Sequence, residues 1–228
     1  MRVIVVGLGV QGYKRREHAE ADYVASVDPV NPEADYKKIE EVPLDSYDAA
    51  LLCVPDEPKV ELLRYCLNNK KHALVEKPMW AAKDEQIREL EKLSHDNAVA
   101  CYTAYNHRFE PHFVRMRDLI FSGELGKIYS CRMFYGNGTA RLVRDSVWRD
   151  QGNGVLPDLG SHLLDTCRFW FGNDIGDFRL LSSHRFENQA ADHVVIGIDN
   201  QALRIELEMT LCMWRNHFTC DILAEKGS

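Results

Sequence analysis

Residues 3–12 read VIVVGLGVQG, an apolar run followed by the glycines Gly7, Gly9 and Gly12. The run is short and rich in β-branched residues, so it predicts a buried strand over residues 2–6. The glycines satisfy the pattern G-x-G-x-x-G, and the polar segment after them predicts a helix that extends to Ala21. The stretch therefore predicts a strand, a tight turn and a helix, the first half of a βαβ unit.

Asp28 completes this pattern, because it ends the next expected strand, residues 23–27. In a dinucleotide site the glycines let the backbone approach the pyrophosphate, which binds at the helix N-terminus. A carboxylate at the end of the second strand accepts hydrogen bonds from ribose hydroxyls. The alternative is a glycine turn with a structural role only. We expect a dinucleotide to contact Gly7, Gly9, Val10, Gln11, Gly12 and Asp28.

The sequence around Asp28 favours NAD over NADP. A carboxylate repels a 2′-phosphate, and residues 29–34 contain no arginine or lysine to receive one. Lys14 and Arg15 lie just inside the expected helix, and we expect them to be solvated. The alternative is that they reach a phosphate.

Strands and helices continue to alternate after this unit, which predicts an α/β protein with a Rossmann-type, doubly wound parallel sheet. We expect strands over residues 49–54, 72–75 and 99–103, and helices over 59–68, 83–95 and 113–121. From residue 126 the segments become longer and alternate in polarity, which predicts an α+β domain with a mainly antiparallel, open sheet. Its expected strands are 127–135, 193–198, 202–210 and 217–223, with a helix over 158–169. We place the two domains at residues 1–121 and 122–228.

The segment Glu76-Lys77-Pro78 follows the expected strand 72–75. It therefore lies at the carboxyl edge of the parallel sheet, where ligands bind in such folds. A lysine there can donate a hydrogen bond to a substrate hydroxyl, and Glu76 can hold its ammonium in place. The alternative is a surface Glu–Lys pair before a turn.

Residues 154–165 read GVLPDLGSHLLD and place Asp158, His162 and Asp165 at helical spacing. Residues three and four apart share one helix face. An imidazole flanked by carboxylates on a buried face is a candidate proton acceptor with a fixed ring. The alternative is a hydrogen-bonded core histidine.

Taken in order, six motifs resemble the Gfo/Idh/MocA family of NAD(P)-dependent sugar and cyclitol oxidoreductases, from residue 3 to about residue 170. They are GLGVQG (7–12), VPDEP (54–58), VEKP (75–78), YNHRF (105–109), SGELGKI (122–128) and PDLGSHLLD (157–165). The resemblance implies a Rossmann domain and a second domain whose open sheet lines the substrate site and commonly builds an oligomer interface. We therefore expect a homo-oligomer formed through that sheet.

By this resemblance the family's catalytic lysine falls on Lys77, and its D-x-x-x-H pair falls on Asp158 and His162. The same three residues would bind substrate. The resemblance also implies cofactor contacts near the nicotinamide by Val54, Pro55, Glu76, Lys77 and Asn106. Weaker candidates for substrate contacts, chosen by position, are Arg108, Tyr135, Trp148 and Arg149. The chain departs from the family at Pro58-Lys59, where a histidine is usual, and it is shorter than is usual. We expect a fragment, or a shortened protein that hides its exposed sheet edge by association.

The expected activity is hydride transfer between a nicotinamide and a secondary alcohol or ketone of a sugar, nucleotide sugar or polyol. A free lysine with a pKa of about 10.4 is neutral in only about one part in a few thousand at pH 7, a handicap of roughly 4 to 5 kcal/mol, whereas a histidine near 6.5 is mostly neutral. This favours His162 as the base, oriented by Asp158, with Lys77 as a charged hydrogen-bond donor. The alternative reverses the roles of His162 and Lys77. Two other functions stay open: a non-catalytic NAD-binding module or sensor, and an NAD-assisted glycoside-cleaving or eliminating enzyme.

Composition limits the partners. The formal net charge is −7 with acidic and basic residues interspersed, so we expect no nucleic-acid or membrane partner. No long apolar run or cleavage signal is present, and we expect a cytoplasmic protein. The seven cysteines form no CxxC pair, so we expect reduced and mostly buried thiols. We expect no metal, because His107, His112 and His217 have no carboxylate or thiol at ligand spacing.

Overall fold

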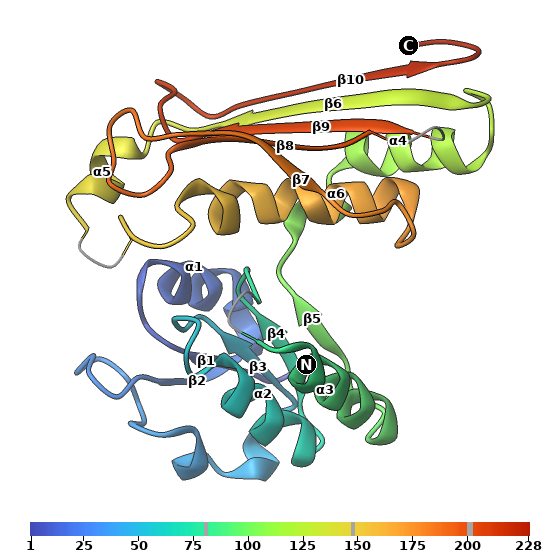
Figure 1. The fold of residues 1–228 in the computed structure, drawn as a ribbon. Helices are drawn as coiled ribbons and strands as arrows, with labels where there is room; N and C mark the ends of the chain where they lie inside the picture. Colours follow the sequence, from blue (N-terminus) through green and yellow to red (C-terminus); the bar gives the residue numbers. More distant parts are fainter. Residues whose placement is uncertain (80–81, 147–148, 200–202) are drawn as a thin grey trace. The chain divides into compact units, whose positions relative to one another are not determined.

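The computed structural model describes residues 1–79, 82–146, 149–199 and 203–228, which form two compact units, Met1–Ala104 and Tyr105–Ser228 (Figure 1). This division lies before α4 (Pro111–Phe121), which we grouped with the first domain from the sequence. The helix lies in the second unit because it packs on α6 (Ser161–Phe171) and places Phe113 in the core of that unit. The domain limits at residues 121 and 122 stay a prediction.

The first unit is a parallel five-stranded sheet in the order β2-β1-β3-β4-β5. Its strands are β1 (Val3–Val6), β2 (Tyr23–Val27), β3 (Ala49–Leu52), β4 (His72–Val75) and β5 (Cys101–Thr103), and its helices are α1 (Val10–Ala19), α2 (Lys59–Asn68) and α3 (Asp84–Asp96). These elements confirm the expected Rossmann-type sheet. The strand order reverses direction between β1 and β3, so the carboxyl ends of these two strands form the switch point at which such sheets bind ligands.

The second unit is also a five-stranded sheet, in the order β10-β6-β9-β8-β7. Its strands are β6 (Ile128–Gly136), β7 (Arg179–His184), β8 (His193–Asp199), β9 (Arg204–Thr210) and β10 (His217–Ala224). Only β6 and β9 pair in parallel, so the expected mainly antiparallel sheet is confirmed. Both α4 and α6 lie along one face of the sheet (Figure 1). There Leu163 and Cys167 of α6 join Met133, Leu207 and Met209 of the sheet in one core.

Among the described residues of the second unit, the strand β7 and the short helix α5 (Ala140–Arg144) are not predicted by the sequence. The helix expected over 158–169 also differs at its start from the helix that the structure shows. A π-helical turn, Leu156–Gly160, precedes α6. Such wide turns have poor intrinsic stability and are frequent at functional sites. This turn carries Asp158, whereas His162 lies in the first turn of α6.

The cysteines are all free thiols. Three of them, Cys66, Cys131 and Cys167, are buried, and the other four are partly exposed. The expectation of mostly buried thiols is therefore correct for only three of the seven. Within the described ranges we find no helix that has both the length and the apolarity needed to cross a bilayer.

Candidate active site

The glycine turn connects β1 to α1 and packs against Cys53, which follows β3, at the switch point of the first sheet. Gly7 has a φ of +91°, and a Cβ on it would lie 2.4 Å from the carbonyl oxygen of Cys53, which follows β3. A Cβ on Gly12 would lie 1.9 Å from the carbonyl oxygen of Gly7, so α1 packs directly on the turn. A Cβ on Gly9 would meet nothing within 4 Å. The turn is closely packed on the protein side and open at Gly9, as close approach of a pyrophosphate requires.

Val10 and Gln11 are exposed at the start of α1, next to this open side of the turn. Their backbone N–H groups belong to the first turn of the helix, where N–H groups have no partner within the helix. Such groups and the helix dipole attract anions. These backbone N–H groups could therefore hold a pyrophosphate, and the contacts by Val10 and Gln11 stay a prediction.

Asp28 follows β2 at the same sheet edge and is held by three backbone amides. Its Oδ2 accepts from Leu8 N at 2.8 Å, and its Oδ1 accepts from Val30 N at 2.9 Å and Asn31 N at 2.8 Å. Burial opposes ionisation of this carboxyl, but the hydrogen bonds from Asn31, Leu8 and Val30 outweigh it, and the pKa of Asp28 is lowered. The carboxylate is thus charged and fixed in orientation beside the glycine turn.

Two basic residues lie close to this region. Lys37 donates from Nζ to Asn31 O at 2.8 Å and contributes to lowering the pKa of Asp28. Arg15 was expected to be solvated, and this is wrong. Its Nε and Nη2 lie 2.8 and 2.7 Å from Glu76 Oε1, with 34% of the Arg15 side chain exposed. The carboxylate of Glu76 therefore binds Arg15 of α1, and the expected contact between Glu76 and Lys77 stays a prediction.

The loops after β3 and β4 carry the other predicted cofactor contacts of the first unit. Val54 and Pro55 follow β3, and Glu76 and Lys77 follow β4. Because both strands are parallel to β1, all four residues lie at the edge that carries the glycine turn. Lys59, which the sequence marks only as a departure from the family pattern, is buried in this region. The ammonium of Lys59 lies 2.6 Å from Asp56 Oδ1 and 2.7 Å from Pro78 O.

In the second unit, His162 is buried in a cluster of rings. The ring centroid of His107 lies 4.7 Å from that of His162, and the centroids of Tyr105 and Tyr135 lie 5.9 and 6.1 Å away. Burial raises the pKa of Tyr135, and the charges of Asp158 and Glu110 act in the same direction. The structure therefore brings Tyr135, a predicted substrate contact, together with His162.

Asp158 lies within reach of a second predicted substrate contact. Its Oδ2 is 3.7 Å from Arg149 Nη2, and both side chains are one-third exposed. The structure therefore brings Arg149 and Asp158 together. Trp148, another predicted substrate contact, lies outside the described residues.

Asp165, which we expected beside His162, forms an ion pair with Arg108. Arg108 donates from Nε to Oδ2 at 2.8 Å and from Nη2 to Oδ1 at 2.7 Å, and its guanidinium lies over the ring of Phe169. This bidentate pair joins the 3-10 turn Asn106–Phe109 to α6. It explains the position of Arg108 without a substrate, and a substrate contact by Arg108 stays a prediction.

The carboxylate of Glu110 lies close to three side chains, those of Asn106, His107 and His112. Its Oε1 lies 3.4 Å from Asn106 Nδ2 and 3.9 Å from His107 Nε2, and its Oε2 lies 3.3 Å from His112 Nε2. We expected no carboxylate or thiol at ligand spacing from these two histidines, and this is wrong, because Glu110 lies near both of them. In the part of the chain that the structure describes, no group of three or more His, Cys, Asp or Glu side chains is arranged to hold a metal ion.

Comparison with known proteins agrees with this geometry. The model of an oxidoreductase family with an NAD-binding Rossmann fold matches residues 1–105, and the model of the GFO/IDH/MocA C-terminal domain matches residues 113–228. The chain belongs to the Gfo/Idh/MocA family. The resemblance that we drew from six motifs is confirmed.

Relatives of this Gfo/Idh/MocA chain include characterised dehydrogenases. It is 27% identical over 144 residues to glucose-6-phosphate 3-dehydrogenase of Bacillus subtilis, covering 61% of this chain and 41% of that protein. It is 29% identical over 131 residues to myo-inositol 2-dehydrogenase of Thermotoga maritima, covering 56% and 37%. The matches span about half the length of the curated relatives or less.

Solved structures of similar proteins show the same fold. The crystal structure of GenD2 from gentamicin A biosynthesis, in complex with NAD, superposes with a TM-score of 0.82 at 22% identity, covering 100% of this chain and 70% of that one. At this level of identity the likeness shows the fold alone.

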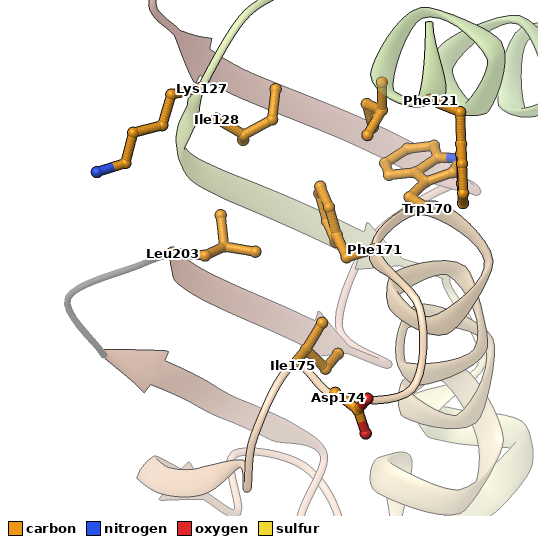
Figure 2. Close-up of a pocket in the computed structure, with 9 residues that line it drawn as sticks. Phe121, Lys127, Ile128, Trp170, Phe171, Asp174, Ile175 and Leu203 are labelled. Carbon is orange, nitrogen blue, oxygen red and sulfur yellow. The ribbon is translucent and has the colours of Figure 1, made fainter. Parts of the chain in front are cut away.

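A cavity of about 560 Å³ lies elsewhere in the second unit, between the ends of α4 and α6 and the starts of β6 and β9 (Figure 2). Its walls are mostly apolar, with Trp170 and Phe171 prominent, and the charged ends of Lys127 and Asp174 point away from them (Figure 2). No predicted site residue lines it. This cavity is therefore distinct from the candidate active site.

Proposed function

We propose that this chain belongs to an NAD-dependent dehydrogenase that transfers a hydride between the cofactor and a secondary alcohol or ketone of a sugar, nucleotide sugar or polyol. The proposal combines the family, the characterised relatives and the geometry of the two units. The relatives named above act on a sugar phosphate and on an inositol, and both substrates are small and rich in secondary hydroxyls.

The observation that carries the proposal lies within the first unit. The glycine turn, Asp28 and Lys77 all lie at the carboxyl edge of one parallel sheet, next to its switch point. Ligands of doubly wound sheets bind at this place. A lysine beside a dinucleotide site is a suitable donor to the oxygen of an alcohol that is being oxidised.

The choice of NAD rests on Asp28. Its ionised carboxylate accepts hydrogen bonds from ribose hydroxyls and repels a 2′-phosphate. Lys37 lies near Asp28, but its ammonium is bonded to Asn31 O. The prediction is that the chain binds NAD at least about tenfold more tightly than NADP, a difference of about 1.4 kcal/mol.

When bound, the nicotinamide supplies the hydride acceptor or donor. His162 takes up the proton of the substrate hydroxyl, because a histidine with the ordinary pKa of about 6.5 is mostly neutral near pH 7. Asp158 orients the imidazole and favours the imidazolium that forms. Lys77 donates a hydrogen bond to the oxygen as it gains negative charge.

A homo-oligomer formed through the second sheet is part of the proposal. The sheet ends at β7, which exposes Leu180 and Leu181 by 65% and 57%. Exposed edges with apolar side chains are commonly covered by association. Light scattering on the purified chain tests this, and a monomer at all concentrations would contradict it.

The test of the proposed function is turnover. The purified chain is incubated with NAD and a panel of hexoses, hexose phosphates, nucleotide sugars and inositols, and NADH is followed by absorbance. We expect NADH to accumulate with at least one member of the panel. Binding of NAD without turnover would favour a sensor, whereas product formation without net NADH would favour an eliminating or glycoside-cleaving enzyme.

The roles of the two candidate bases are separated by a pH profile. His162→Ala is expected to lower kcat/KM by about 10² to 10⁴-fold and to remove the acidic limb of the profile. Near wild-type rates with an unchanged acidic limb would exclude His162 as the base and assign that role to Lys77.

A further inference from the structure

Lys59 occupies a place that is unfavourable for a lysine. It is the first residue of α2, and only 4% of its side chain is exposed. Burial of an ammonium is costly unless the charge is paired and hydrogen-bonded. The partial positive charge of a helix N-terminus adds a further repulsion. Something other than helix stability must therefore explain a buried cation at this position.

The contacts of Lys59 show what it does in the structure. Its Nζ lies 2.6 Å from the Asp56 carboxylate and 2.7 Å from the carbonyl oxygen of Pro78. Asp56 belongs to the loop after β3, and Pro78 belongs to the loop after β4. One ammonium thus ties together the two loops that carry Val54, Pro55, Glu76 and Lys77.

The bond to Pro78 is the more informative of the two. Asp56 is 43% exposed, and water can solvate its carboxylate without Lys59. The carbonyl of Pro78 belongs to the residue directly after Lys77, so its bond to Lys59 restrains the backbone that presents the Lys77 ammonium. Replacing a buried ion pair by apolar groups is often neutral for stability. The pair is therefore better explained by geometry than by stability.

We propose that Lys59 is a positioning residue for the hydride-transfer site, which holds the loop of Lys77 at a fixed distance from the loop after β3. The proposal rests on the proposed function, because it takes Lys77 as the hydrogen-bond donor to the reacting oxygen. Hydrogen bonds to a developing charge act only when the donor is preorganised. A displacement of about 1 Å at a reacting group costs roughly 10²-fold in rate.

The test is Lys59→Met, which keeps the unbranched apolar part of the side chain and removes the ammonium with its donors. The matched control is Lys71→Met in the same unit. Lys71 also donates to a backbone carbonyl, that of Tyr47 at 2.8 Å, but it precedes β4 and therefore lies at the opposite edge of the sheet. Loss of one such bond is expected in both variants, and only Lys59→Met affects the Lys77 loop.

Two readouts are measured on the full chain. In the first, steady-state kinetics with the best substrate of the panel should show kcat of Lys59→Met lowered by about 10²-fold, while Kd for NADH changes by less than about fivefold. In the second, amide hydrogen exchange of the peptide containing residues 76–79 should be about tenfold faster than in the wild type. Lys71→Met should change neither quantity.

The outcomes separate this proposal from the proposed function. A wild-type chain without turnover on any substrate refutes the proposed function, and the exchange measurement then decides alone whether Lys59 holds the Lys77 loop. Unchanged exchange in Lys59→Met overturns the proposal whatever the kinetics. Faster exchange with unchanged kcat in an active enzyme also overturns it, because the restraint would then have no effect on the reaction.

Discussion

Two single variants, Gly12→Ala and Gly9→Ala, distinguish the packing of the glycine turn from its role in binding the dinucleotide. A Cβ at position 12 would lie 1.9 Å from Gly7 O and 2.9 Å from Gly7 C. Ordinary contacts between heavy atoms are about 3.5–4.0 Å, so α1 or the turn must move by more than about 1 Å. Both atoms belong to the backbone, and no flexible side chain can relieve the overlap.

The expected loss of stability follows from this geometry. Overpacking costs about 1–3 kcal/mol, and the rigid backbone partner places Gly12→Ala at or above the upper end. The helix propensity of alanine returns about 1 kcal/mol. The net loss is then about 2 kcal/mol, which lowers the Tm of a unit of this size by roughly 10 °C.

Gly9→Ala is expected to behave differently. A Cβ there meets nothing within 4 Å, and Gly9 has a φ of −82°, which alanine adopts readily. The unfolding free energy should therefore stay within about 0.5 kcal/mol of the wild type. The new methyl group occupies the open side of the turn, and NAD should bind about 10- to 100-fold more weakly.

The assays are thermal unfolding followed by circular dichroism and titration of NADH fluorescence. The expected pattern is low stability with weak binding for Gly12→Ala, and normal stability with weak binding for Gly9→Ala. Two results would refute the reasoning: wild-type Tm in Gly12→Ala, which would mean that the turn is not packed as described, or wild-type NADH affinity in Gly9→Ala, which would place the pyrophosphate elsewhere.

Two further predictions concern charges. Arg108→Leu leaves the buried Asp165 carboxylate without its bidentate partner and should lower the unfolding free energy of the second unit by about 3 kcal/mol. The double variant with Arg108→Leu and Asp165→Leu should recover most of that loss, as measured by urea denaturation. Equal losses in the single and double variants would contradict this prediction. The lowered pKa of Asp28 means that its contribution to stability is present above the ordinary carboxyl pKa of about 3.9 and is lost as pH falls through the lower folded-state pKa. The difference in Tm between the wild type and Asp28→Asn should therefore shrink below about pH 4 in a pH series of melting curves, and a difference independent of pH would show that the charge of Asp28 is not involved.

Elements with a strong local pattern were predictable. The helix Lys59–Asn68 and the strands Tyr23–Val27 and His72–Val75 have the predicted bounds. In a parallel sheet with covered faces, buried strands are short apolar runs that need no partner to be recognised. By contrast, β7 was missed, because most of its residues are exposed and its sequence RLLSSH has no alternation. It becomes a strand through pairing with β8.

The parts of the candidate site that depend on local sequence were also predictable, and the rest were not. The glycine spacing and Asp28 follow from local geometry, because a tight turn and a nearby helix N-terminus require particular residues at particular positions. The π-helical turn before α6 has no comparable signal, since a wide turn is set by the packing around Leu159 and Gly160 in the core. The position of Asp158 relative to His162 therefore depended on the tertiary structure.

The sequence by itself determined the order of strands and helices in the first unit, the glycine turn and the family, because these depend on residues near one another in the chain. The tertiary structure alone decided which charges meet. Arg15 and Glu76 are 61 positions apart, and Arg108 and Asp165 are 57 apart. Periodicity and spacing describe neighbours along one element, whereas these pairs form only where sheet and helix packing bring distant segments together.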